Sequence, residues 1–150
     1  MPAPKNKLTL SVQYADKRLQ ETIPRPTIRK WVQAALMADA ELAIRFVDTA
    51  EGQVLNRDYR GKDYATNVLT FAYTEDENEP TRADIILCTD VLLKEAEEQK
   101  KTIEEHVAHL IVHGVLHAQG YDHMEETDAE EMENLEASIL EGLGYPDPYL

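Results

Sequence analysis

The stretch His113-Gly114-Val115-Leu116-His117-Ala118-Gln119-Gly120-Tyr121-Asp122-His123 dominates the interpretation of this 150-residue sequence. His113 and His117 are four residues apart, so on a helix their side chains share one face, with Cβ atoms roughly 6 Å apart, and can reach one metal ion. Gly120 predicts the end of that helix, because glycine adopts a left-handed conformation without steric cost. The chain can then turn and bring His123 to the same ion. The stretch therefore predicts a metal site with His113, His117 and His123 as ligands.

The two remaining histidines, His106 and His109, lie on the same predicted helix. Residues eight apart on a straight helix are about 12 Å apart along its axis, so His109 and His117 cannot share one ion. A single histidine on an apolar helix is usually a core residue with a satisfied hydrogen bond. We therefore interpret His106 and His109 as core residues.

The spacing of the three predicted ligands matches the frame by which metzincin proteases hold zinc, with one difference. Gly114 stands where such a protease carries its general-base glutamate. Three imidazoles leave one open position on a tetrahedral Zn²⁺, where a water becomes a nucleophile near neutral pH. Without the carboxylate, amide cleavage would be slow, whereas a metal and an arginine can together stabilise the charge that develops on a phosphodiester. The sequence favours a nuclease with one zinc ion per chain.

Charge is strongly polarised along the chain. The net charge is −14, yet residues 1–62 carry 11 Lys/Arg against 7 Asp/Glu, and residues 63–150 carry 4 against 22. An anionic substrate must therefore be bound by the N-terminal half. The acidic run from Glu125 to Glu136 is interpreted as a solvated helix face.

The segment 57–66 (RDYRGKDYAT) is predicted to be an exposed loop because it is polar, contains glycine and lacks periodicity. Arg57 or Arg60 could bind the scissile phosphate through the guanidinium fork, with Lys62 adding positive charge. Tyr59 or Tyr64 could stack on a base. This segment is the predicted substrate-binding surface.

The periodicity of apolar residues predicts an α+β fold. The length predicts a single catalytic domain covering residues 1–150. The expected strands form a mixed sheet of about four and are 8–14, 42–47, 67–73 and 82–88. Two helices are expected at 27–40 and 89–99, and a helical stretch capped by Asp48 or Thr49 runs toward Asn56. Two further helices are expected to begin at the caps Thr102 and Thr127. The zincin-like three-histidine site would then lie on one helix and the turn after it.

Composition excludes several classes of protein. No apolar stretch reaches the ~20 residues that a membrane span requires, and no apolar region follows the N-terminal lysines as in a secretory signal. Cys88 has no second cysteine with which to form a disulfide, and its apolar neighbours predict burial. We expect a cytoplasmic protein without membrane partners.

The quoted stretch, together with residues 56–71 (NRDYRGKDYATNVLTF) and 130–145, resembles the YbeY family of bacterial rRNA-processing endoribonucleases. The resemblance spans nearly the whole chain. It implies a zinc-dependent, single-strand-specific endoribonuclease that matures rRNA, notably the 3′ end of the small-subunit rRNA, and takes part in ribosome quality control. It also implies RNA, the small ribosomal subunit and its proteins as partners. By this resemblance the zinc ligands are His113, His117 and His123, and the family's essential arginine corresponds to Arg60.

In the predicted mechanism, Arg60 and the metal ligand His113 are the catalytic residues, and the nucleophile is either a zinc-activated water or the RNA 2′-hydroxyl. Two alternatives stand beside it. One is a zinc metalloprotease, which shares the histidine frame. The other is a non-catalytic ribosome-assembly factor with a structural zinc, which could dock on basic ribosomal proteins through its acidic C-terminal helix. A structural zinc would be closed by a fourth protein ligand.

Overall fold

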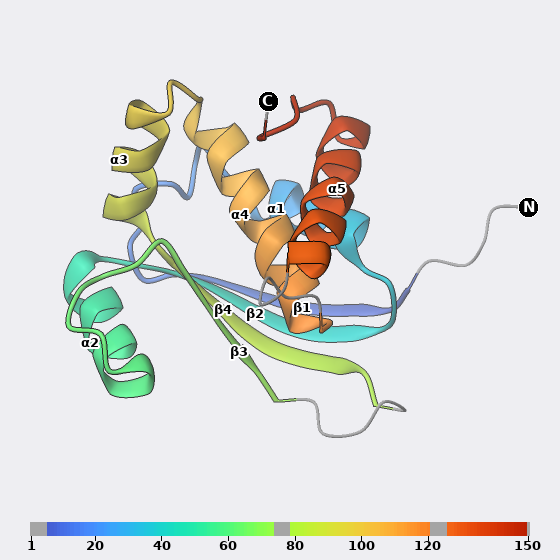
Figure 1. The fold of residues 1–150 in the computed structure, drawn as a ribbon. Coiled ribbons are helices and arrows are strands. Elements are labelled where there is room, and N and C mark those ends of the chain that lie inside the picture. The colour runs from blue at the N-terminus through green and yellow to red at the C-terminus, as the bar shows by residue number, and fades with distance from the viewer. Residues whose placement is uncertain (1–5, 74–78, 121–125, 150) are drawn as a thin grey trace, which may run out of the picture.

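The computed structural model describes residues 6–73, 79–120 and 126–149 (Figure 1). The elements, in chain order, are β1 (Leu8–Tyr14), α1 (Arg25–Ala35), β2 (Ala40–Val47), α2 (Thr49–Arg60), β3 (Val68–Ala72), β4 (Thr81–Cys88), α3 (Thr89–Glu98), α4 (Ile103–Ala118) and α5 (Glu126–Gly142).

The strands form one four-stranded sheet in the order β1-β2-β4-β3. β1, β2 and β4 run parallel, with Val12 opposite Ile44 and Ile44 opposite Ile85. β3 pairs with β4 in the antiparallel sense, with Thr70 opposite Ile85. The predicted α+β class and the mixed four-stranded sheet are confirmed.

Helices cover both faces of this sheet. α1, α4 and α5 lie on one face, whereas α2 lies on the other, near the start of β3 and the end of β4 (Figure 1). The larger hydrophobic cluster fills the first interface and includes Trp31, Ile85 and Leu116. A smaller cluster beneath α2 contains Val47, Leu69, Ile86 and Cys88, with Leu55 and Phe71 packed against it. Cys88 is 1% exposed, which confirms its predicted burial.

α4 is the central helix and contacts α1, α3, α5, β3 and β4. It begins where predicted, because the Thr102 hydroxyl accepts a hydrogen bond from the Glu105 backbone N–H at 3.1 Å. It ends at Ala118, and Gly120 has φ of 103°, so the predicted left-handed glycine after the helix is confirmed.

The first helix begins and ends earlier in the chain than predicted. The helix spans Arg25–Ala35 and not 27–40, because Pro26 fits the first turn, where a backbone N–H has no helical partner. Ala40 instead begins β2, opposite Leu8. At the other end of the chain, α5 begins at Glu126, so Thr127 lies inside the helix and does not precede it as predicted.

The predicted loop 57–66 was wrong for its first four residues. Asp48 caps α2 by accepting a hydrogen bond from the Glu51 N–H at 2.9 Å, and the helix continues through Arg60. Gly61 then ends it in the left-handed conformation, with φ of 70°. This last turn is polar because it is solvent-exposed, and its arginines lie favourably near the negative end of the helix dipole. Tyr59 and Arg60 are therefore carried by a helix.

Within the described ranges, none of the helices combines the length and the apolar character that crossing a bilayer demands.

Candidate functional site

A pocket of about 490 Å³ lies where α2, β3 and α4 meet. Tyr59 and Arg60 line it from the end of α2, residues 68–71 line it from β3, and His113 and His117 line it from α4. α2 and α4 lie on opposite faces of the sheet (Figure 1), and the pocket is lined from both helices and from the edge strand β3. The structure thus brings together four of the predicted site residues.

His113 and His117 present parallel imidazole rings toward this pocket. Their planes differ by 4° and their ring centroids are 6.4 Å apart, as expected for residues one helical turn apart. Imidazole is a preferred zinc ligand, so this pair fits the predicted metal. The third predicted ligand, His123, lies outside the described residues. Among the residues that are described, no three His, Cys, Asp or Glu side chains gather as a metal site.

Glu136 of α5 is fully buried and contacts His113 directly. Its Oε1 lies 2.5 Å from His113 Nδ1, and its Oε2 lies 3.2 Å from His109 Nε2. The Tyr149 hydroxyl also donates to Glu136 Oε2. The carboxylate therefore connects a predicted metal ligand to α5 and to the segment that follows it.

These contacts determine the protonation of the carboxylate. Burial alone raises the pKa of Glu136, but hydrogen bonds from His109, His113 and Tyr149 outweigh burial and lower the pKa to about 2. For Tyr149 both effects act in the same direction, because burial and the hydrogen bond to Glu136 each raise the pKa of the phenol. Glu136 is thus a carboxylate at neutral pH, and Tyr149 keeps its proton.

Sequence reasoning missed Glu136, because it was included in the acidic run interpreted as a solvated face. That interpretation is wrong for this residue, although Glu130 and Glu131 are exposed as expected. A signal was present: Glu136 lies four residues after Met132 and four before Leu140, both fully buried, so it occupies the apolar stripe of the helix.

The other two histidines differ from each other. His106 is 2% exposed and its Nε2 lies 3.1 Å from Glu95 Oε1, which confirms the core interpretation. Burial is the main cause of its lowered pKa, and the Glu95 contact opposes it. His109 instead contacts Glu136 and Tyr149, at 3.2 and 3.1 Å from its Nε2.

The predicted substrate-binding residues divide into two groups. Arg60 lines the pocket, and no carboxylate of the described residues forms an ion pair with it. Tyr59 is 68% exposed, while its ring packs against Phe71 with centroids 4.9 Å apart, which leaves ring surface for a base. Arg57 and Lys62 are exposed but do not line the pocket, and Arg57 lies 3.4 Å from Asp58.

Local contacts hold the end of α2 in place. Asn56 is fully buried, and its side-chain amide donates to the Tyr64 carbonyl at 2.7 Å. This bond fixes the segment that follows Gly61 against the helix. The helix end that carries Arg60 is therefore tied to the segment after it.

Gly114 packs against the sheet, facing Ile85 of β4 and Thr70 of β3. A Cβ at this position would be 3.2 Å from Ile85 Cγ2 and 3.4 Å from Thr70 Oγ1. The first contact is tighter than ordinary van der Waals separation, so a larger residue would push α4 away from the sheet. The packing disfavours the glutamate that the protease alternative requires at this position.

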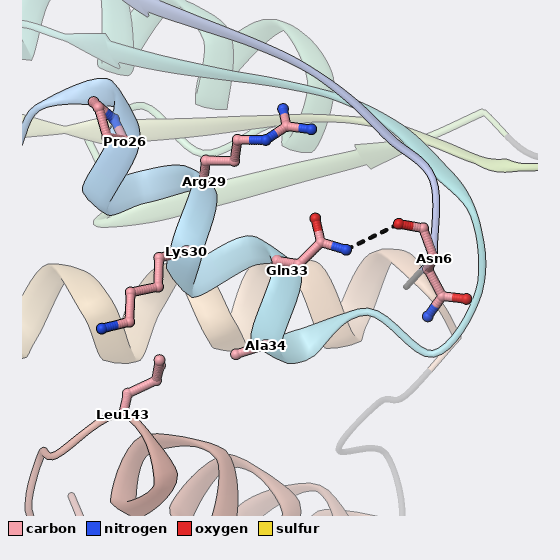
Figure 2. Close-up of a pocket in the computed structure, with 7 residues that line it drawn as sticks. All are labelled: Asn6, Pro26, Arg29, Lys30, Gln33, Ala34 and Leu143. Carbon is pink, nitrogen blue, oxygen red and sulfur yellow. Dashed lines mark hydrogen bonds between the residues drawn. The ribbon is translucent and has the colours of Figure 1, made fainter. Parts of the chain in front are cut away.

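A second pocket, of about 670 Å³, lies beside α1 and near Leu143 (Figure 2). Its lining includes Arg29, Lys30 and Gln33, and Gln33 donates to the Asn6 carbonyl at 2.9 Å, the bond drawn in Figure 2. No imidazole, thiol or carboxylate is among its lining side chains, so it offers neither metal ligands nor a general base. The pocket at β3 is the better candidate for chemistry.

Comparison with known proteins points to one family. The family model for "Endoribonuclease YbeY" matches residues 10–144. A protein named Endoribonuclease YbeY from Janthinobacterium sp. (strain Marseille) is 69% identical over 97% of this chain and 97% of its own length. The protein of the same name from Herminiimonas arsenicoxydans is 62% identical over 97% of both chains.

The fold also matches a solved structure. The solution structure of TM1509 from Thermotoga maritima superposes with a TM-score of 0.57 and 22% sequence identity, covering 91% of this chain and 92% of that one. At this identity the match supports the fold alone. The matches in sequence extend over nearly the whole chain, including the segments that carry Arg60, His113 and His117. The chain therefore belongs to the YbeY endoribonuclease family.

Proposed function

We propose that this protein is a zinc-dependent, single-strand-specific endoribonuclease that acts in the cytoplasm on rRNA, at the 3′ end of the small-subunit rRNA, and in ribosome quality control. Membership of the family supports nuclease activity. The observation that carries the proposal is the pocket that places Arg60 beside His113 and His117. The guanidinium of Arg60, a group suited to binding phosphate, thus faces the same pocket as the two imidazoles suited to binding zinc.

His113 and His117, with His123 as the third ligand, would hold one zinc ion. When bound, zinc supplies Lewis-acid polarisation of a phosphoryl oxygen. The protein's contribution is to hold the ligands in place, because α4 contacts α1, α3 and α5 as well as strands β3 and β4. His113 is further held by its hydrogen bond to Glu136.

Arg60 would bind the scissile phosphate through two N–H groups and stabilise the negative charge that develops on its oxygens. Tyr59 would stack on an adjacent base. Such stacking requires a base that is not already paired and stacked in a duplex, which is the physical basis proposed for single-strand specificity. The nucleophile would be either water or the RNA 2′-hydroxyl, and a 2′,3′-cyclic phosphate product would identify the hydroxyl.

The charge distribution supports a ribosomal setting. α5 exposes Glu130 and Glu131, and a negatively charged helix face attracts basic proteins of the kind that bind rRNA. The same face would serve a non-catalytic assembly factor with a structural zinc. Cleavage distinguishes the two functions.

The decisive experiment measures cleavage of a labelled single-stranded RNA by protein of known zinc content. His117→Ala should lose both zinc and cleavage. Arg60→Ala should keep its zinc and cut about 10²–10³-fold more slowly, the usual cost of removing one preorganised donor to a developing charge. Lys30→Ala is the matched control, because it removes a positive charge from the second pocket (Figure 2) and should cut like the unaltered protein.

Two results would contradict the proposal. If the unaltered protein binds zinc but cuts no faster than Arg60→Ala and His117→Ala, the assembly-factor function is favoured. If Lys30→Ala loses as much activity as Arg60→Ala, general positive charge matters and the pocket at β3 is not the site.

A further inference from the structure

Glu136 contacts His113 from outside the pocket. It is fully buried on α5 and is not among the residues that line the pocket, yet its Oε1 lies 2.5 Å from His113 Nδ1. Burying a carboxylate costs free energy unless it is well hydrogen-bonded. Met132 and Leu140 occupy the same stripe of α5, so an apolar residue would fill this position at lower cost. Packing alone therefore does not explain a carboxylate at position 136.

The chemistry of the contact specifies the proton. An ionised carboxylate is only a hydrogen-bond acceptor, so the hydrogen between the two groups belongs to His113 Nδ1. In a neutral imidazole with Nδ1 protonated, the lone pair is on Nε2. Nε2 is then the nitrogen that would ligate a metal, and the contact also fixes the rotation of the ring.

We propose that Glu136 is a positioning residue that holds His113 in the tautomer and orientation required for zinc binding, an inference that rests on the zinc site of the proposed function. A carboxylate behind a ligating histidine also raises the basicity of the ligand. Loss of such partners typically costs 10–100-fold in metal affinity.

The surrounding contacts keep Glu136 itself in place. His109 Nε2 lies 3.2 Å from Oε2, and the Tyr149 hydroxyl donates to the same oxygen. With Oε1 bound to His113, both carboxylate oxygens are occupied and rotation of the carboxylate would break several bonds. His109, which cannot share an ion with His117, thus gains a role as support for the carboxylate.

The experiment compares zinc affinity, measured by competition with a chromogenic chelator, among variants of the full chain. Glu136→Gln is nearly isosteric, but its single amide oxygen cannot accept from both His113 and His109. We expect zinc affinity to fall about tenfold in Glu136→Gln and about 100-fold in Glu136→Ala. Glu131→Gln is the matched control, because it removes the same charge from an exposed position on the same helix.

A second measurement needs neither zinc nor RNA. Nitrogen NMR of the zinc-free protein reports which ring nitrogen of His113 is protonated. We expect the Nδ1–H form in the unaltered protein and in Glu131→Gln, and a mixture of tautomers in Glu136→Gln. This measurement stays informative if Glu136→Ala fails to fold.

The outcomes separate this inference from the proposed function. If the unaltered protein binds zinc, and Glu136→Gln matches Glu131→Gln in both affinity and tautomer, Glu136 has only a structural role and the inference is wrong. If the unaltered protein binds no zinc, the proposed zinc site itself fails. If affinity falls while cleavage by fully zinc-loaded Glu136→Gln is retained, the positioning role is confirmed.

Discussion

Replacing Gly114 by alanine adds a single methyl group where α4 packs against Ile85 of the sheet. In a helix, alanine is favoured over glycine by about 1 kcal/mol. Against this gain, the new Cβ would lie 3.2 Å from Ile85 Cγ2, so the helix or the strand must shift by a few tenths of an ångström. Overpacking of this kind typically costs ~1–3 kcal/mol. We therefore expect Gly114→Ala to lower the free energy of unfolding by up to about 2 kcal/mol.

Two other glycines provide matched controls. Gly52 lies in α2, and a Cβ there would meet Cys88 Sγ at 3.4 Å, an ordinary contact. Gly142 is the last residue of α5, and a Cβ there would meet nothing within 4 Å. Alanine at either position should raise the free energy of unfolding, by about 0.5–1 kcal/mol in a helix interior and less at a helix end.

The assay is equilibrium unfolding in urea, with thermal unfolding as a second probe. At this chain length 1 kcal/mol corresponds to a shift of roughly 2–4 °C in Tm. The reasoning is refuted if Gly114→Ala is as stable as Gly142→Ala, because the close packing of α4 on Ile85 would then not constrain position 114.

Three further predictions concern Glu136, Asp48 and Arg60. Because the pKa of Glu136 is about 2 when folded against an ordinary 4.5, its stabilising contribution, up to about 3 kcal/mol, is complete above pH 4.5 and is lost as the pH falls toward 2. Glu136→Gln should flatten the dependence of urea-unfolding free energy on pH in that window, and an unchanged slope would contradict the assignment. Asp48→Ala should lower the free energy of unfolding by about 1 kcal/mol, because it removes the 2.9 Å cap to the Glu51 N–H; equal urea midpoints would show that the cap contributes nothing. Arg60→Lys keeps the charge but loses the guanidinium fork, so kcat/KM for single-stranded RNA should fall about tenfold or more, and full activity would show that charge suffices.

Local sequence patterns predicted the parts of the fold that depend on local physics. The alternation from Leu8 to Tyr14 gave the bounds of β1 correctly, because one face of that strand is buried. Thr102 was correctly identified as a helix cap, and of the two candidate caps for α2, Asp48 and Thr49, the structure selects Asp48. The spacing of His113 and His117 also predicted two rings on one helix face.

The rest depended on tertiary contacts. The last turn of α2 contains no apolar residue except Tyr59, so its helical state was not visible in the hydrophobic pattern. Glu136 was assigned to a solvated face because its two histidine partners are 23 and 27 residues away in sequence. The role of His123 stays a prediction, because that residue lies outside the described part of the chain.

The two halves of the candidate site rest on separate foundations. The histidines belong to a helix seated on the larger hydrophobic cluster, whereas the arginine belongs to a helix seated on the smaller cluster, across the sheet. A substitution that disturbs one hydrophobic cluster need not disturb the other. If the proposed zinc site holds, Leu55→Ala beneath α2 should lower RNA cleavage while leaving zinc content unchanged. Zinc binding and RNA cleavage would then respond to different substitutions, so RNA binding could change during evolution without loss of the metal.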